Sequence, residues 1–120
     1  MVSGPLKFSK EERLCGKTCI DVLFSSGRSF KYFPFRVVCL ENNANQSHKV
    51  LFSVPRRTFK KAVDRNKIKR RAREAFRLNR SFFPQEKKFD IGLIYIAKEV
   101  LPFSFIESKV QEIGKRLCTF

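Results

Sequence analysis

The sequence has little of what metal centres are usually built from. Its 120 residues include one histidine and 11 acidic residues. Four cysteines are present, Cys15, Cys19, Cys39 and Cys118, but they form no CxxC pair and show no zinc-type spacing with histidine. We therefore expect reduced, buried thiols in place of a metal site, and no cofactor bound by the protein alone.

Sequence motifs of catalysis are also missing. There is no Gly-rich phosphate loop, no GxSxG, no HExxH and no cysteine–histidine pair with supporting context. Asp64 and Glu74 sit among arginines, where an ion pair is the favoured interpretation over metal-assisted hydrolysis. His48 lies in the polar stretch 41–49, which indicates a loop residue and not a general base. Any chemistry must therefore come from a partner.

Long hydrophobic runs are absent as well. No segment approaches the roughly 18 to 20 apolar residues of a membrane span, and the N-terminus has no apolar core of a signal peptide. We expect a cytoplasmic protein with neither a membrane partner nor a small-molecule substrate. The length and the 42% hydrophobic content favour one domain over residues 8–120, preceded by a flexible segment at 1–7.

Positive charge is what the sequence has in excess, and it is concentrated in one helical segment. Residues 56–80 contain twelve Lys or Arg and two acids, which accounts for ten of the fifteen net positive charges. Over residues 62–80, helical spacing places Ile68, Ala72, Ala75 and Phe76 within an arc of about 100°. This arc predicts a face packed in the core.

A basic ridge adjoins the predicted core face of that helix. It consists of Asn66, Lys69, Arg70, Arg73, Arg77 and Arg80. A charge run on a helix is usually only a solvated face. Here, however, like charges at i, i+4 repel and lower helix stability by a few tenths of a kcal/mol per pair. An anionic polymer would relieve this repulsion, and such a helix, about 28 Å long, can follow several phosphates.

The other elements follow from periodicity and from Pro and Gly breaks. We expect a helix at about 16–26 that ends at Gly27, followed over 29–40 by a strand pair or by one long strand disturbed at Pro34. A second strand is expected at 49–54, after an Asn-rich hairpin loop. The basic helix, a buried strand at 90–97 and a helix at about 105–117 complete the chain. The order α-β-β(-β)-α-β-α indicates an α/β fold, a two-layer α/β sandwich with helices on a small mixed sheet.

Alternation and helical spacing also predict which side chains point inward. In the first helix these are Cys19, Ile20, Leu23 and Phe24. In the strand after Pro34, Phe35, Val37 and Cys39 share one face, and Arg36, Val38 and Leu40 share the other. In the last helix the inward residues are Ile106, Val110, Ile113 and Leu117.

Residues 61–76 closely resemble the signature of the protein subunit of bacterial ribonuclease P. In that family an Arg-Asn core is followed by Lys-Arg and then by Arg, here Arg65, Asn66, Lys69, Arg70 and Arg73. The resemblance continues in family order through the first helix, the strand before the basic loop and the last strand. It implies a ribosomal-protein-like fold whose strand–helix–strand unit crosses over left-handed, against the general right-handed preference.

The resemblance also implies a function. The family enzyme removes the 5′ leader from precursor tRNA, and its RNA subunit carries the magnesium-dependent hydrolysis. This chain would then bind the ribonuclease P RNA subunit and precursor tRNA, with no catalytic residue of its own. The expected RNA-contacting residues are Arg65, Asn66, Lys69, Arg70 and Arg73, the basic pair Arg56 and Arg57, and Arg77 on the ridge. The expected cleft for the leader, between the first helix and the sheet, involves Ile20, Phe24, Arg36 and Val38.

Three other functions fit the charge and the size. A ribosomal or RNA-assembly protein would bind structured RNA without any catalysis. A DNA-binding regulator would place the basic helix in a major groove, although one flank of that helix is predicted core and no preceding helix with a tight turn is seen. A self-sufficient nuclease would need an active site that the sequence does not show.

Overall fold

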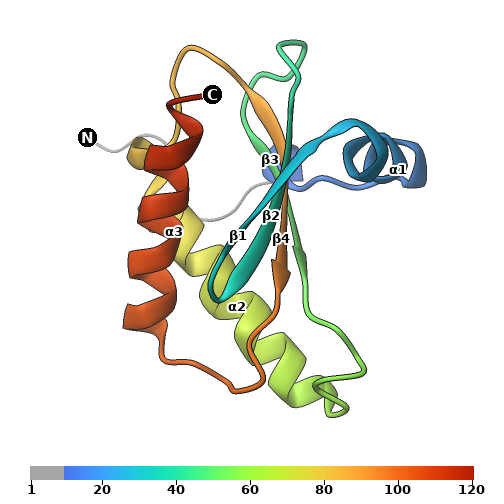
Figure 1. The fold of residues 1–120 in the computed structure, drawn as a ribbon, viewed down its shortest axis with the longest axis vertical. Coiled ribbons are helices and arrows are strands. Elements are labelled where there is room, and N and C mark those ends of the chain that lie inside the picture. Colours follow the sequence, from blue (N-terminus) through green and yellow to red (C-terminus); the bar gives the residue numbers. More distant parts are fainter. Residues whose placement is uncertain (1–9) are drawn as a thin grey trace.

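Residues 10–120 are described by a computed structural model, and the predicted flexible segment 1–7 lies outside them. In chain order the elements are η1 (Lys10–Glu12), α1 (Lys17–Ser26), β1 (Arg28–Tyr32), β2 (Phe35–Glu41), β3 (Lys49–Ser53), α2 (Ala62–Leu78), η2 (Arg80–Phe82), β4 (Phe89–Tyr95) and α3 (Phe103–Leu117). In Figure 1 the sheet is seen edge-on, with α1 on one side and α2 and α3 on the other. The predicted α/β fold with helices on a small mixed sheet is confirmed.

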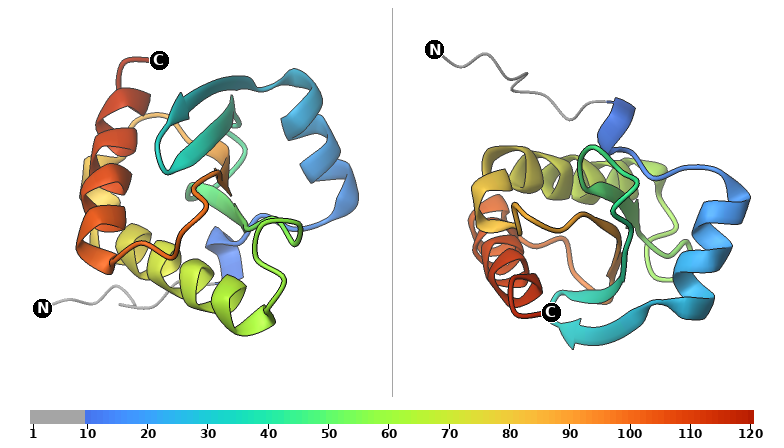
Figure 2. Two further views of the ribbon diagram at one scale, coloured as in Figure 1. Left: turned by 60° about the horizontal axis from the view of Figure 1, so that its bottom comes forward. Right: turned by 90° about the horizontal axis from the view of Figure 1, so that it is seen from above.

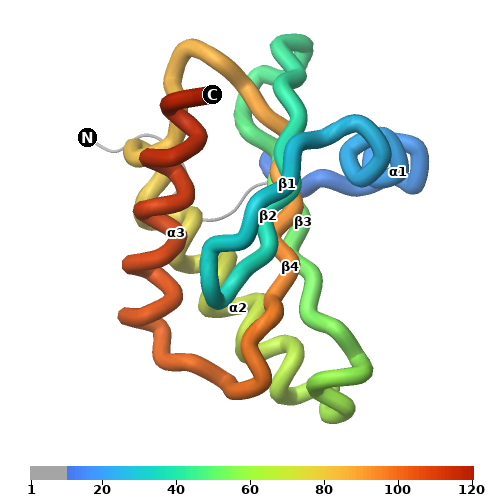
Figure 3. Tube along the Cα trace, viewed as in Figure 1, coloured from blue at the N-terminus to red at the C-terminus, as the bar shows by residue number. Residues whose placement is uncertain are grey.

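The order of the strands corrects one expectation. The sheet runs β1-β2-β4-β3, with β3 parallel to β4 and the other pairs antiparallel. β2 and β3 are therefore not a hairpin, because β4 lies between them; Figure 3 shows the connecting loop passing over the end of the sheet. Amides of that loop hold the buried Asp90 of β4, from Asn42 at 3.2 Å and from Asn45 at 2.7 Å.

The central place of β4 has a physical reason in its composition. Six of its seven residues are buried, which only a strand with neighbours on both edges and cover on both faces achieves. The parallel pair β3 and β4 is joined through α2, so this helix is the crossover that the family resemblance implies to be left-handed. Of the two alternatives for 29–40, the strand pair is the one found: it consists of β1 and β2, which meet at Phe33 and Pro34.

The main core lies between the sheet and the two helices α2 and α3. All four predicted core residues of α2 are at most 1% exposed, and so are the four of α3. From β2 the core receives Phe35, Val37 and Cys39, as alternation predicts. Gly114 of α3 lies so close to Phe83 that an added Cβ would stand 2.9 Å from the ring, so this helix packs closely only with glycine there.

The opposite face of the sheet has a much smaller core. Leu14, Leu23 and Val38 are buried there, with Ile20 and Ile94 partly buried around them. Of the residues predicted to point inward from α1, Leu23 is confirmed, whereas Cys19 and Phe24 are exposed. The prediction was wrong for Cys19, because α1 touches the sheet along one narrow stripe only, which helical spacing alone cannot measure. Phe24 does point toward the sheet, since a Cβ added at Gly92 would lie 3.6 Å from its Cζ, but its ring is only partly covered.

The thiols correct one further expectation, whereas the histidine lies where it was expected. All four cysteines are free, but only Cys39 is buried, and burial raises its pKa to about 11. His48 does lie in the loop between β2 and β3, yet its side chain is buried. Its Nε2 is 2.7 Å from the carbonyl oxygen of Pro84, and its Nδ1 accepts the Phe89 N–H at 3.0 Å. The ring is therefore neutral, with the proton on Nε2, and burial lowers its pKa.

No helix within residues 10–120 combines the length and the apolar character that crossing a membrane requires.

Candidate nucleic-acid interface

The middle of α2 carries cations that the fold does not use. Asn66, Arg70 and Arg73 are exposed, and Lys69 is half-buried. Within residues 10–120 none of the three cations among them donates a side-chain hydrogen bond or pairs with a carboxylate at 4 Å or less. We name this set, Asn66, Lys69, Arg70 and Arg73, the free stretch of α2. Its guanidinium and ammonium groups are available to an anion.

The C-terminal part of the predicted ridge is different. Arg77 donates hydrogen bonds to Glu74 one turn earlier, which lowers the pKa of that carboxyl. Arg80 lies beyond the end of α2 and donates two hydrogen bonds to Glu12, from Nε to Oε2 at 2.6 Å and from Nη2 to Oε1 at 2.7 Å. The ridge is therefore shorter than predicted. Helical periodicity could not reveal the pair between Arg80 and Glu12, because these residues lie 68 positions apart in the sequence. An RNA contact by Arg77 stays a prediction.

Arg65 holds the loop that precedes α2. Its Nη1 donates to the carbonyl oxygens of Phe59 at 2.7 Å and of Lys60 at 3.0 Å. These bonds fix the end of the basic loop 54–61, in which Arg56 and Arg57 are both exposed. Of the residues expected to contact RNA, Arg65 thus has a structural task in addition, since it ties the basic loop to the first turn of α2.

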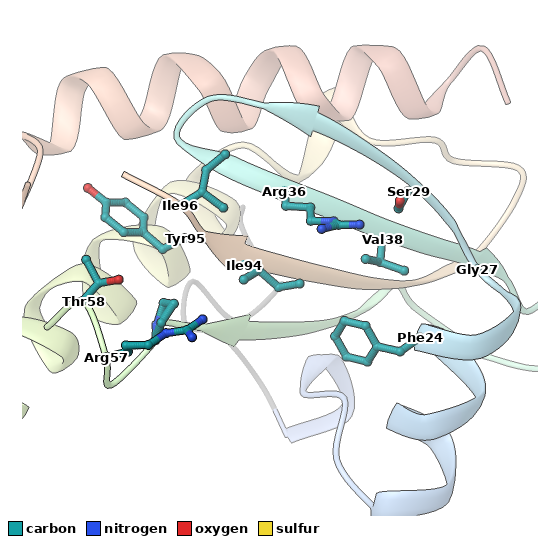
Figure 4. Close-up of a pocket in the computed structure, with 11 residues that line it drawn as sticks. Phe24, Gly27, Ser29, Arg36, Val38, Arg57, Thr58, Ile94, Tyr95 and Ile96 are labelled. Carbon is teal, nitrogen blue, oxygen red and sulfur yellow. The ribbon is translucent and has the colours of Figure 1, made fainter. Parts of the chain in front are cut away.

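A pocket of about 490 Å³ opens on the face of the sheet that α1 only partly covers (Figure 4). It is lined by Phe24, Gly27, Ser29, Arg36, Val38, Pro55, Arg57, Thr58, Ile94, Tyr95 and Ile96. Three of the four residues predicted for the leader cleft, Phe24, Arg36 and Val38, are brought together here. Ile20 does not line the pocket; it packs against the small core under α1 instead.

Ile94 and Arg57 belong to this pocket although the sequence interpretation did not place them there. Ile94 pairs with Arg36 in the β2–β4 register, so both side chains point to the same face. Alternation along β4 could have assigned Ile94 to this face of the sheet. The segment is almost wholly apolar, however, so its sequence shows no contrast between the two faces. Arg57 arrives from the loop after β3, and in Figure 4 Ile94 lies between it and Phe24.

The chemistry of this arrangement is that of binding. Aliphatic side chains and the Phe24 ring, 45% exposed, offer an apolar surface, while Arg36 and Arg57 offer charge. The hydroxyl of Tyr95 is already engaged, because it donates to the Glu99 carbonyl oxygen at 2.6 Å and accepts the Leu101 N–H at 3.2 Å. In the described part of the chain no three His, Cys, Asp or Glu residues gather in a way that could hold a metal ion.

The fold and these two surfaces define a small basic α/β binding domain. The family model described as Ribonuclease P matches residues 8–118. The chain therefore belongs to the ribonuclease P protein family, as the signature in residues 61–76 indicated.

Individual relatives agree with this assignment. A ribonuclease P protein component of Porphyromonas gingivalis is 32% identical, over 92% of this chain and 88% of that protein. The corresponding protein of Thermotoga maritima is 34% identical over 92% of this chain and 95% of its own length. Among solved structures, the T. maritima RNase P protein superimposes with a TM-score of 0.75 at 31% identity, covering 88% of this chain and 96% of that one. A Staphylococcus aureus RNase P protein gives 0.67 at 25% identity, over 94% of each chain.

Proposed function

We propose that this chain is the protein subunit of a ribonuclease P, which binds the catalytic RNA and the 5′ leader of precursor tRNA and promotes removal of that leader. The observation that carries the proposal is the position of Arg57. It belongs to the basic loop before α2 and also lines the pocket with Phe24 and Arg36. The basic loop that leads into α2 therefore also forms part of a pocket suited to a single strand.

Each part would have its own task. The cations of the free stretch of α2 would neutralise phosphates of the RNA subunit, a contribution that positions the protein and depends on salt. In the pocket, one base would stack on Phe24, a contact worth about 1 to 3 kcal/mol per base. Arg36 and Arg57 would hold the adjoining phosphates. Hydrolysis itself belongs to the RNA subunit and its magnesium, and this chain supplies affinity and orientation.

The test is reconstitution with the cognate RNA subunit at low magnesium. Adding the protein should raise the rate of leader cleavage, and its absence should leave the rate low. No gain on adding folded protein contradicts the proposal. Recovery of ribosomal RNA, in place of a single RNA subunit, from a gentle purification of the protein also contradicts it and favours the ribosomal alternative.

A matched pair of variants locates the leader. Phe24→Ala should weaken binding of precursor tRNA with a long leader by about 1 to 3 kcal/mol, and should leave binding of mature tRNA unchanged. Val22→Ala is the control, because Val22 has the same 45% exposure on the same helix but does not line the pocket. Equal effects of the two changes would place the leader elsewhere.

A further inference from the structure

The seam between β1 and α3 carries a second group of cations, which the proposed function does not use. Arg28 of β1 lies over the Phe120 ring, with its Cζ 4.7 Å from the centroid. Arg116 of α3 lies over the Phe30 ring at 4.5 Å. The two rings meet edge to face at 5.6 Å. We name these four residues the seam quartet; the two rings lie next to each other and each carries one arginine.

The two arginines of the seam quartet are positioned by the rings but keep their hydrogen-bond donors available. Within residues 10–120 neither Arg28 nor Arg116 donates a side-chain hydrogen bond or pairs with a carboxylate, and both are exposed. Stacking on a ring uses the face of a guanidinium and leaves the N–H donors at its edge. A guanidinium held in this way is ready to make the paired hydrogen bonds that a phosphate accepts.

Further cations follow the same seam. Lys109 lies 5.7 Å from the Tyr32 ring and 5.4 Å from the Phe105 ring, and Lys31 is exposed on β1. Of the nearby acids, Glu112 is hydrogen-bonded to the Tyr32 hydroxyl. Glu41 lines a hollow of about 320 Å³ beside the quartet, together with Arg28 and Phe120. The positive charges thus outnumber the negative ones along the seam.

Packing alone does not account for this arrangement. The contact between Phe30 and Phe120 joins the sheet edge to the chain end without any charge. Each arginine gains a cation–π contact with its ring, but positive charges on two adjoining rings repel each other, and an anion lying against them would relieve that repulsion. The charge excess and the ring-oriented guanidinium groups together favour a polyanion with phosphate groups over an acidic protein, whose carboxylates are spaced irregularly.

We propose that the seam between β1 and α3 binds the phosphate backbone of a second RNA segment. In Figures 1 and 2 the seam lies on a different side of the molecule from α2, on which the proposed contact with the RNA subunit depends. The inference rests on the proposed function, because only an RNA large enough to fold around the protein reaches both surfaces. The protein then acts as a bridge that holds two RNA segments at a fixed separation.

The experiment removes the two charges and keeps the rings. The double variant Arg28→Gln/Arg116→Gln is compared with Lys17→Gln/Lys98→Gln, which loses the same charge from exposed positions outside α2, the pocket and the seam. With the cognate RNA subunit, the seam variant should bind about tenfold more weakly and show a salt slope smaller by up to about 2. The control should change much less. Arg28→Lys/Arg116→Lys should recover part of the affinity, since it keeps the charge and loses the stacked guanidinium plane.

Backbone footprinting of the bound RNA separates the outcomes. The seam variant should lose one patch of protection while keeping the patch that Arg73→Ala removes. If both variants lose the same patch, or if the seam variant matches the control in affinity and slope, the inference is overturned and the proposed function stands. If the wild-type protein itself binds no cognate RNA, the proposed function fails first. Unchanged RNA binding combined with lost binding of poly-glutamate would assign the seam to an acidic protein and overturn the inference.

Discussion

The middle of α2 and its C-terminal end contain similar side chains with opposite fates. In the middle, the free stretch has no acidic partner within residues 10–120. At the end, Arg77 and Arg80 are bound to Glu74 and Glu12. Arg80, Glu12 and the buried His48 also line one small hollow there. Residue type and helical position therefore do not by themselves decide whether an arginine serves the fold or a ligand. An acid within reach decides, which for Arg77 is Glu74 on the same helix and for Arg80 is Glu12, 68 positions away.

The largest effect should come from the apolar side of the C-terminal end. Phe76→Ala should lower the free energy of unfolding by about 3 to 5 kcal/mol, because Phe76 is 1% exposed and meets Phe83 edge to face at 5.0 Å. Denaturant titration measures this loss. At a temperature where the variant is still folded, the salt slope of RNA binding should be unchanged.

A smaller effect is expected from the ion pair at the same end. Arg80→Met should lower the free energy of unfolding by about 1 to 3 kcal/mol, because it leaves the Glu12 carboxylate, 9% exposed, without its guanidinium. The double variant Glu12→Gln/Arg80→Met should regain part of the loss, since it removes the buried carboxylate charge as well. If the double variant is the less stable of the two, the pair does not act as described.

The pH dependence of stability tests His48. Because burial lowers the pKa of His48 below its ordinary 6.5, the unfolded chain binds the proton more readily than the folded chain. The contribution is fully present above pH 6.5 and is lost as the pH falls toward the folded-state pKa, with a slope of at most about 1.4 kcal/mol per pH unit. His48→Asn, whose Oδ1 can accept the Phe89 N–H, should flatten the curve between pH 7 and pH 5. A curve with the same slope in both proteins would rule out His48 as the cause.

The smallest effect on stability should come from the free stretch. Arg73→Ala should leave the free energy of unfolding nearly unchanged, because its exposed guanidinium has no partner within the described residues. It should reduce the salt slope of RNA binding by up to about 1, which corresponds to one phosphate contact. If Arg73→Ala unfolds the protein while Phe76→Ala folds normally, the assignment of the two faces of α2 is wrong.

Most of what could be predicted from the sequence depended on local spacing. The core faces of α2 and α3, the break at Gly27 and the alternation along β2 each follow from residues within a few positions of one another. α1 ends at Gly27 because the backbone there is extended, with φ −78° and ψ 159°, and an added Cβ would come within 2.5 Å of the Leu23 carbonyl oxygen, so that glycine fits best. The family signature was also local, since it lies within one loop and one helix.

What could not be predicted depended on residues far apart in the chain. The place of β4 between β2 and β3 depends on pairing between strands that lie far apart in the sequence, and local spacing does not encode it. The bonds from the Asn-rich loop to Asp90 likewise span 45 and 48 positions. Arg80 is not part of the ridge because it pairs with Glu12, which lies 68 positions away in the sequence. Arg57 lines the pocket because the loop after β3 starts beside β4, whose Ile94 and Tyr95 line the same pocket, and no period in the sequence encodes that neighbourhood.

The small core under α1 holds this helix to the sheet only weakly. Only Leu23 is fully buried in α1, whereas the helices on the other side of the sheet bury several residues each. Amide hydrogens of α1 should therefore exchange with solvent through a low-energy partial opening, long before those of β4 and α2, which await global unfolding. Because Phe24 belongs to this weakly held helix, a single-stranded RNA bound in the pocket would slow amide exchange in α1 more than anywhere else in the protein.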